Sequence, residues 1–254
     1  MKPTPKSKTK TAAGAPPQPL PPLLAFGAHP DDIEFGCGGV IAAESGKGRA
    51  VHLLVCSRGE SATHGTPRQR LSEAAAAAKI LGASLEFLEL DGDAHLEIRT
   101  SHAIKIAEII RRFQPGIVLA PTLVENQHPD HPRLGRLVSD AARLARYGGF
   151  AELKHQPAHA IDQLLFYAIT PDAEPAGAIP LLVDVSDPKT IATWSQAMQA
   201  HATQTRAREY VELAIARARV RGLQAGLSHA LALFPSDPIV IDSLSQLGHG
   251  ARRF

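Results

Sequence analysis

Short apolar runs and helical patterns alternate along residues 23–146, and this alternation constrains the fold more than any other feature of the chain. Apolar runs of strand length lie at residues 23–27, 50–56, 85–90 and 117–120. The helical patterns that separate and follow them lie at residues 40–47, 67–81, 103–113 and 133–146. Strands that alternate with helices form parallel sheets covered by those helices. We therefore predict an α/β, Rossmann-like fold with a mostly parallel sheet flanked by helices on both faces.

The second half of the chain is less regular, but it contains no internal repeat and no linker that would separate it from the first half. Strand-like runs and helical patterns lie at residues 163–168, 181–185, 188–200 and 206–224. We expect residues 23–254 to form a single domain. Residues 1–22 contain four lysines, no acidic residue and seven of the 20 prolines, a composition that predicts a flexible Pro/Lys-rich tail.

Charge and cysteine content exclude several classes of protein. Without the four lysines of residues 1–22, the chain has 23 basic and 25 acidic side chains, so we expect no nucleic-acid partner. No apolar stretch approaches the ~20 residues of a membrane helix, and residues 1–22 lack the apolar core of a signal peptide. Cys37 and Cys56 are the only cysteines, which favours a reducing, cytoplasmic location.

Two clusters of polar residues follow the ends of two predicted strands. Residues 29–34 read HPDDIE after the first strand, and residues 126–131 read NQHPDH in the loop after the fourth. The carboxyl ends of parallel strands meet at one edge of a sheet, where ligands bind. Histidine and carboxylate side chains are zinc ligands. A single His-Pro-Asp is also common turn chemistry, but two such clusters at two strand ends favour a metal site.

The motifs around these clusters resemble those of the LmbE-like (PIG-L) family of zinc-dependent N-acetylglucosamine deacetylases. Residues 28–34 read AHPDDIE, and GCGG follows at residues 36–39. The sequence HPDH at residues 128–131 is similar to the second motif of the family. The segment between them resembles the family at residues 58–60, 65–66 and 70–74. The resemblance extends from about residue 23 to about residue 233.

This resemblance implies three metal ligands and three residues that act on the substrate. The ligands would be His29, Asp32 and His131. In the same family pattern Asp31 would be the general base, His128 would face the substrate, and Asp130 would orient His128. These roles suit amide hydrolysis, because zinc lowers the pKa of bound water to about 7 and polarises the carbonyl group.

Three further residues are candidate substrate contacts. The family residue that matches Arg70 contacts the sugar, although a surface pair with Glu73 is the alternative. Asp93 follows the third strand and faces either the pocket or a turn. Residues 226–231 read GLSHAL where the family often has Gly-x-x-Tyr-Ala-Glu, so His229 replaces a tyrosine. An ordinary, partly buried histidine is an equally good interpretation of His229, and the substrate stays open.

Together, these features predict a metal-dependent N-deacetylase that acts on an N-acetylglucosamine-type sugar or conjugate and releases acetate and a free amine. We expect one Zn²⁺ per chain, with Fe²⁺ as the alternative, a small-molecule acetylated amino sugar as the substrate, and a homo-oligomer. A zinc amidohydrolase for bulkier amide conjugates and a non-catalytic sugar-binding module are alternatives. A nucleotide-dependent oxidoreductase is disfavoured because the glycines at residues 36–39 do not match GxGxxG.

Overall fold

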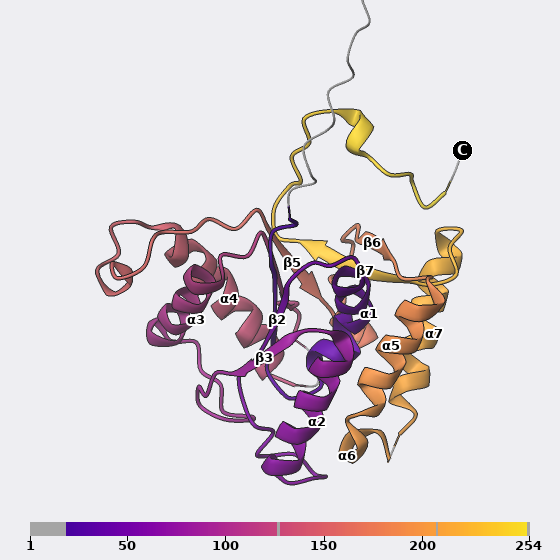
Figure 1. Ribbon diagram of the computed structural model, residues 1–254, viewed down its shortest axis with the longest axis horizontal. Coiled ribbons are helices and arrows are strands. Elements are labelled where there is room, and N and C mark those ends of the chain that lie inside the picture. The colour runs from indigo at the N-terminus through magenta and orange to yellow at the C-terminus, as the bar shows by residue number, and fades with distance from the viewer. Residues whose placement is uncertain (1–18, 126–127, 207, 253–254) are drawn as a thin grey trace, which may run out of the picture.

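The computed structural model describes residues 19–125, 128–206 and 208–252. Most of the predicted flexible tail, residues 1–18, lies outside the described residues. The described chain forms a central sheet with helices packed on its two faces (Figure 1). This arrangement confirms the predicted fold class.

Seven strands form the sheet in the described part of the chain, in the order β3-β2-β1-β4-β5-β7-β6. The strands that pair in parallel are β1 (Leu23–Gly27), β2 (Val51–Val55), β3 (Ser84–Phe87), β4 (Ile117–Pro121) and β5 (Gln163–Tyr167). Strand β7 (Ala230–Pro235) pairs antiparallel with β5 and with β6 (Leu181–Asp184). Because β1 lies between β2 and β4, the direction of strand order reverses at β1, which is where open parallel sheets bind ligands.

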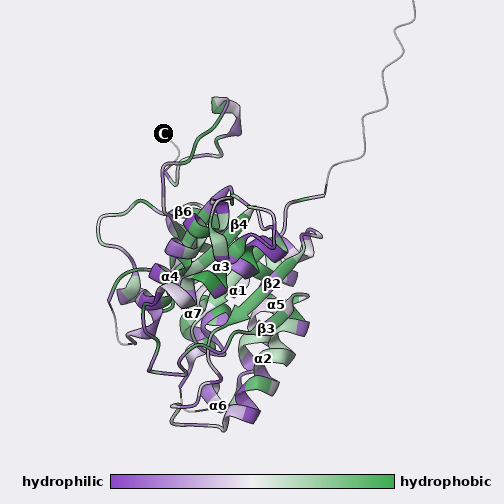
Figure 2. Ribbon diagram, turned by 90° about the vertical axis from the view of Figure 1, so that its left-hand side faces the viewer, coloured by the Kyte–Doolittle hydropathy of each residue, from purple (hydrophilic) through white to green (hydrophobic). Residues whose placement is uncertain are grey.

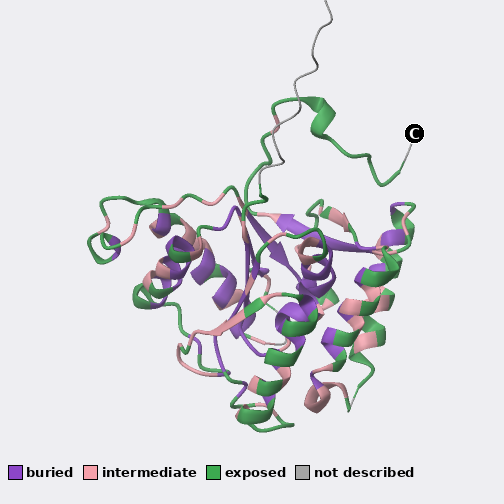
Figure 3. Ribbon diagram, viewed as in Figure 1, coloured by how far each residue is buried: buried purple, intermediate pink, exposed green. Residues whose placement is uncertain are grey.

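Two layers of helices cover the sheet. One face carries α3 (Thr100–Phe113) and α4 (Asp130–Arg146), and the other carries α1 (Asp32–Gly46), α2 (Pro67–Leu81), α5 (Pro188–Gln199) and α7 (Tyr210–Gln224) (Figure 1). The short helices are α6 (Ala202–Thr205) and the 3₁₀ turns Ala151–Leu153, Pro171–Ala173 and Leu244–Gln246. A buried apolar cluster lies on each face, and Figures 2 and 3 show the strands as mainly hydrophobic and buried. None of the described helices combines the length and apolar character that a membrane crossing requires.

Helix α1 begins earlier than residue 40, where the sequence pattern predicts it, and includes the glycine run. A Cβ atom on Gly36 would lie 2.2 Å from the ring of Tyr167, and one on Gly38 would lie 2.7 Å from the ring of Trp194. The glycines therefore let α1 approach these two rings closely. Glycine has low helix propensity, but here this packing decides the conformation. The Tyr167 hydroxyl donates to the carbonyl of Phe26, and the Trp194 Nε1–H donates to that of Glu34, both at 2.7 Å.

Strand β7 was not predicted from the sequence, because its residues 230–235 read ALALFP and alanine and leucine favour helices. Pairing with a strand on each side determines its conformation instead. Helix α7 begins at Tyr210, later than the predicted residue 206.

A buried arginine holds the end of α4. Arg111 extends from α3, is 2% exposed, and donates hydrogen bonds to the carbonyl groups of Leu144, Ala145, Tyr147, Leu153 and Gln156. The last carbonyl groups of a helix have no partner within the helix and carry partial negative charge. Arg111 therefore satisfies the end of α4 and the turn that follows it.

We expect Arg111→Met to lower the free energy of unfolding by about 2–4 kcal/mol, because several buried carbonyl groups would lose their donor. Urea unfolding followed by circular dichroism measures this change. Arg112→Met is the matched control, since Arg112 pairs with Glu86 at the surface, where such pairs contribute only ~0–1 kcal/mol. Equal effects of the two substitutions would contradict the role assigned to Arg111.

Candidate functional site

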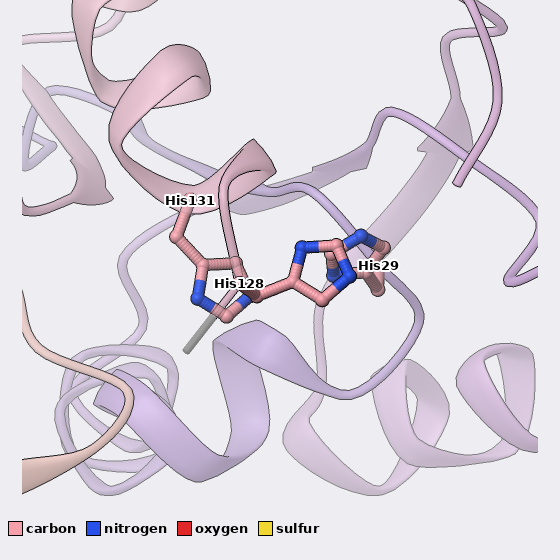
Figure 4. Close-up of side chains that lie close together, drawn as sticks. All are labelled: His29, His128 and His131. Atoms are coloured by element: carbon pink, nitrogen blue, oxygen red, sulfur yellow. The ribbon is translucent and has the colours of Figure 1, made fainter. Parts of the chain in front are cut away.

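The two polar clusters of the sequence meet at the carboxyl edge of the sheet. Strands β1 and β4 are parallel neighbours, and the residues that follow them bring three imidazole rings together. The ring centroids of His29 and His128 are 4.2 Å apart, and those of His29 and His131 are 5.3 Å apart. Figure 4 shows the three rings side by side. The site therefore combines residues from the start of α1 and the start of α4.

Carboxylates surround the ring of His29 on both sides. Its Nδ1 lies 3.4 Å from Oδ2 of Asp32, and its Nε2 lies 3.2 Å from Oδ1 of Asp93 and 3.3 Å from Oδ2 of Asp130. Burial alone would lower the pKa of His29, but the Asp32 charge and the hydrogen bonds to these acids raise it well above its usual value. A buried histidine among three carboxylates is an unusual concentration of ionisable groups.

Asp32 joins two of the histidines. Its Oδ2 accepts hydrogen bonds from the backbone N–H groups of Ala28 and His29, at 2.9 Å each, and its Oδ1 lies 3.3 Å from Nε2 of His131. Burial would raise the pKa of Asp32, yet the charges and hydrogen bonds of His131 and His29 hold it well below its usual value. The carboxylate is therefore kept ionised.

The donor atoms fit a divalent metal ion. Two sets of side chains in the described chain place donor atoms within 4.8 Å of one another: His29, His128 and His131, and His29, Asp93, His128 and Asp130. Asp32, which the resemblance implies as a ligand, belongs to neither set but contacts two of the histidines. The Nδ1 atom of His131 is buried without a hydrogen-bond partner among the described residues. Imidazole and carboxylate donors of this kind suit Zn²⁺ or Fe²⁺.

Asp31 occupies the residue before α1 with a φ of 122°, in the region that non-glycine residues rarely adopt. Its Oδ1 lies 3.2 Å from Nη2 of Arg70, which also donates to the carbonyl of Pro30. Burial raises the pKa of Asp31 to about 6, although the Arg70 charge opposes this shift. A carboxylate with this pKa is a stronger proton acceptor than an ordinary aspartate.

Arg70 is buried and contacts Asp31 instead of forming the surface pair with Glu73 that was the alternative. The Glu73 carboxylate accepts hydrogen bonds from the backbone and hydroxyl of Thr203, at 2.9 and 2.7 Å. The alternative interpretation of Arg70 is therefore wrong.

Asp93 contacts the rings of both His29 and His128, whereas the Asp130 carboxylate contacts the ring of His29. Nε2 of His128 lies 3.6 Å from Oδ1 of Asp93, whereas the Asp130 carboxylate also accepts from the backbone of Ala94 at 2.8 Å. The backbone N–H of Asp130 donates to Nδ1 of His128 at 3.3 Å. Burial would raise the pKa of Asp93, but hydrogen bonds from His128 and His29 lower it. Asp93 thus contacts two histidine rings of the site, whereas the sequence predicts a contact with the substrate.

A cavity of about 550 Å³ opens over these residues. The predicted site residues that line it are His29, Asp31, Asp32, Arg70, Asp93, His128 and His131. Asp130 lies behind His29, and His229 lies outside the described lining, where its ring contacts the hydroxyl of Ser228 at 2.9 Å. The structure therefore unites seven of the nine predicted site residues at the cavity wall.

Other lining residues were missed by the sequence analysis. Gln204 belongs to the segment HATQ at residues 201–204, which is similar to a His-x-Ser-Gln motif of the family. This similarity is the sequence signal that could have placed Gln204 at the site. Tyr210 and Arg217 lie in α7 and carry no motif. Tertiary packing alone brings these two residues of α7 to the cavity.

Comparison with known proteins identifies the family of the domain that carries the site. Residues 24–142 match the family model described as PIG-L, GlcNAc-PI de-N-acetylase. Residues 24–142 form a domain of the PIG-L family. The resemblance inferred from the motifs is thus confirmed.

Curated relatives of this PIG-L family member have different names. It is 34% identical over 144 residues to 4-oxalmesaconate hydratase of Pseudomonas putida, covering 52% of this chain and 55% of that protein. It is 33% identical over 141 residues to diacetylchitobiose deacetylase of Thermococcus kodakarensis, covering 50% and 51%. The matches therefore span little more than half the length of these relatives.

Solved structures match over more of the chain. The structure of the conserved protein TT1542 of Thermus thermophilus has a TM-score of 0.77 and 30% identity, and the match covers 90% of this chain and 100% of that one. The hydratase GalB of Pseudomonas putida follows with a TM-score of 0.75, 26% identity, and coverage of 89% and 100%. The N,N'-diacetylchitobiose deacetylase of Pyrococcus horikoshii, at 21% identity and a TM-score of 0.71, with coverage of 84% and 82%, shows the shared fold.

Proposed function

We propose that this PIG-L family member is a metal-dependent N-deacetylase that hydrolyses the N-acetyl group of an N-acetylglucosamine-type sugar or conjugate. The observation that carries the proposal is the convergence of His29, Asp32 and His131 with the basic carboxylate of Asp31 at one cavity wall. The similarity to proteins named as deacetylases supports it. We propose Zn²⁺ as the ion, with Fe²⁺ as the alternative.

The proposed ligands are His29, Asp32 and His131, and the surroundings of Asp32 suit this role. A bound ion supplies Lewis acidity, which polarises an amide carbonyl and lowers the pKa of water. Asp32 is held ionised by its histidine neighbours, so it presents a full negative charge to a cation. The hydrogen bonds that its Oδ2 accepts from two backbone N–H groups fix the carboxylate in place.

The proton transfers of the reaction are assigned to Asp31 and His128. Asp31 accepts the proton of the water whose oxygen bonds to the amide carbon, and Arg70 holds this carboxylate in place. His128 faces the cavity beside Asp93 and donates a proton to the amide nitrogen as the carbon–nitrogen bond breaks. The balanced products are acetate and a free amine.

A second candidate function is hydration of a carbon–carbon double bond. The observation that favours it is the similarity to 4-oxalmesaconate hydratase, which matches at 34% identity. Both reactions need an activated water, so the water-activating residues alone do not distinguish them. Two further alternatives remain, a hydrolase for bulkier amides and a sugar-binding module. We also retain as predictions the cytoplasmic location, the homo-oligomer and the single domain over residues 23–254.

Metal analysis of the purified protein, combined with an acetate-release screen over acetylated amino sugars, tests the proposal. We expect about one divalent ion per chain, and acetate release that stops on chelation and returns with added Zn²⁺. Turnover of bulky amides alone would favour the amidohydrolase. Water addition to an unsaturated tricarboxylate without any acetate release would favour the hydratase, and ligand binding without metal dependence or turnover would favour the binding module.

A further inference from the structure

Helix α7 has apolar side chains on two opposite faces, whereas a surface helix of a globular protein normally has one apolar face. Its inner face packs against α1, α5 and β7 and includes Val211, Ala214, Ile215 and Ala218. Its outer face points away from these elements, at the edge of the molecule, where exposed residues recur along the helix (Figures 1 and 3). The core of the domain therefore explains only the inner face.

The apolar residues of the outer face form a continuous row. Its members follow one another at spacings of three, four and three residues, which places them on one side of the helix: Leu213, Ala216, Val220 and Leu223. Leu213, Val220 and Leu223 are 54%, 57% and 61% exposed. An exposed apolar row marks a contact surface for another molecule. Because its spacing is that of the contact row between two packed helices, it favours a helix as the partner.

Two charged side chains beside this row have no counter-charge in the described part of the chain. Glu212 lies toward the start of α7 and Arg219 toward its end, and both are exposed and form no ion pair with any described residue. A hydrogen bond with Glu212 and the charge of Glu212 raise the pKa of Glu209, so the two acids are close neighbours. Burial and the Arg219 charge lower the pKa of His229. The outer face therefore has acids near its start and a base near its end.

The other arginines of this region contact groups outside the row. They are Arg206, Arg208, Arg217 and Arg221. Arg217 and Arg221 share the carboxylate of Glu174, and the Asp172 carboxyl also feels the charge of Arg217. Arg208 lies over the ring of Tyr210, and Arg206 lines a separate hollow beside residues 63–65. The charges that remain open on the outer face are thus those of the two acids and Arg219.

We propose that the outer face of α7 binds the same face of α7 in a second copy of this chain, with the two helices antiparallel about a two-fold axis near Ala216. Ala216 is the smallest residue of the row, so the helices can approach each other closely there. Leu213 of each copy then lies opposite Val220 of the other, and Glu212 of each copy lies opposite Arg219 of the other. The inference goes beyond the proposed function and does not depend on it.

Charge complementarity identifies a second copy as the partner. A two-fold interface uses one surface patch twice, so the patch must be complementary to itself. An antiparallel copy meets this condition, because it places the acidic start of each helix beside Arg219 of the other. The opposed helix dipoles add to this attraction. A membrane surface fits the face less well, since anionic lipids would repel Glu209 and Glu212 beside the apolar row.

Sedimentation velocity of the full chain tests the proposal. The contact is a single helix pair, so we expect self-association with a Kd of about 1–100 µM. Val220→Glu places an unpaired carboxylate in the contact and should raise this Kd at least about tenfold. Val220 is absent from the described lining of the cavity, unlike Leu213. Ile98→Glu is the matched control, because Ile98 is 54% exposed and precedes α3 on the other face of the sheet, and it should leave the Kd unchanged.

Charge reversal tests the antiparallel arrangement independently of the apolar row. Glu212→Arg and Arg219→Glu each place like charges opposite one another at both ends of the contact, so each variant alone should associate at least about tenfold more weakly. A mixture of the two variants restores both pairs of opposite charges, and its Kd should return to within about threefold of the wild-type value. Both positions are exposed, and circular dichroism should show that the variants fold as the wild type does.

Several results would overturn the proposal. A wild-type protein that stays monomeric up to about 500 µM has no such interface. An assembly whose mass neither Val220→Glu nor the charge reversals reduce is held together by another surface. If the mixture of reversed variants associates no better than each variant alone, the helices do not pair antiparallel. Binding of the monomer to vesicles of phosphatidylcholine and phosphatidylserine, lost in Val220→Glu, would assign the row to a membrane instead. These measurements need no turnover, so they stand apart from the outcome of the acetate-release screen.

Discussion

Replacement of His131 by alanine is expected to empty the metal site. The imidazole is buried at the start of α4, and its Nε2 lies 3.3 Å from the Asp32 carboxylate, so its loss removes one of three proposed ligands. Loss of a group that only supports a ligand costs about 10–100-fold in metal affinity, and loss of a ligand should cost more. Metal content measured after dialysis should fall from about one ion per chain to less than about a tenth of that, and acetate release should be lost. Full occupancy in this variant would contradict the ligand assignment.

The companion substitution His128→Ala separates the ligand set implied by the motifs from the two sets of neighbouring donor atoms, both of which contain His128. If His29, Asp32 and His131 are the ligands, this variant keeps its metal and loses activity, because only the proton donor is gone. If the three histidines that lie within 4.8 Å form the ligand set, the variant loses metal as His131→Ala does. Metal content therefore decides the role of His128 independently of activity.

Asp31→Asn is expected to keep the metal and to lower kcat at least about 100-fold, the scale on which general bases contribute. Asparagine has the shape of aspartate and tolerates a positive φ, so the start of α1 should be preserved while the proton acceptor is lost. Steady-state acetate release and metal analysis of the same preparation measure the two effects.

Asp140→Asn serves as the matched control for Asp31→Asn, because Asp140 forms a surface pair with Arg136 on α4 and should change neither readout. Metal loss in Asp31→Asn would instead identify Asp31 as a ligand. An unchanged kcat would exclude it as the base.

Much of the fold could be predicted from local sequence signals. Helix α2 has the predicted bounds, residues 67–81, because Pro67 starts it, the Thr66 and Gln69 side chains cap it, and Gly82 ends it in the left-handed conformation. The start of α1 and the existence of β7 could not be predicted in the same way. Both depend on neighbours that are distant in sequence, and such packing overrides local propensity.

The residues of the site likewise divide into those that local motifs predict and those that only tertiary packing places. The histidines and aspartates of the two motifs could be predicted because each motif is a short segment tied to a strand end. Tyr210 and Arg217 could not, because the face of α7 that meets the cavity is set by packing against α1 and β7. His229 is the opposite case, a residue that the motif comparison predicts at the site but that does not line the cavity. Its backbone packs against Gly222, and its side chain lies outside the described lining.

The close approach of α1 to Tyr167 and Trp194 means that one short segment both packs the core and positions residues of the proposed metal site. His29 and Asp32 lie at the start of the helix that Gly36 and Gly38 allow to approach these rings. A side chain at either glycine would displace the helix and shift the proposed ligands with it. Loss of Asp32 would also disturb the backbone, because its carboxylate accepts hydrogen bonds from the N–H groups of Ala28 and His29, so this segment serves the core and the proposed site at once.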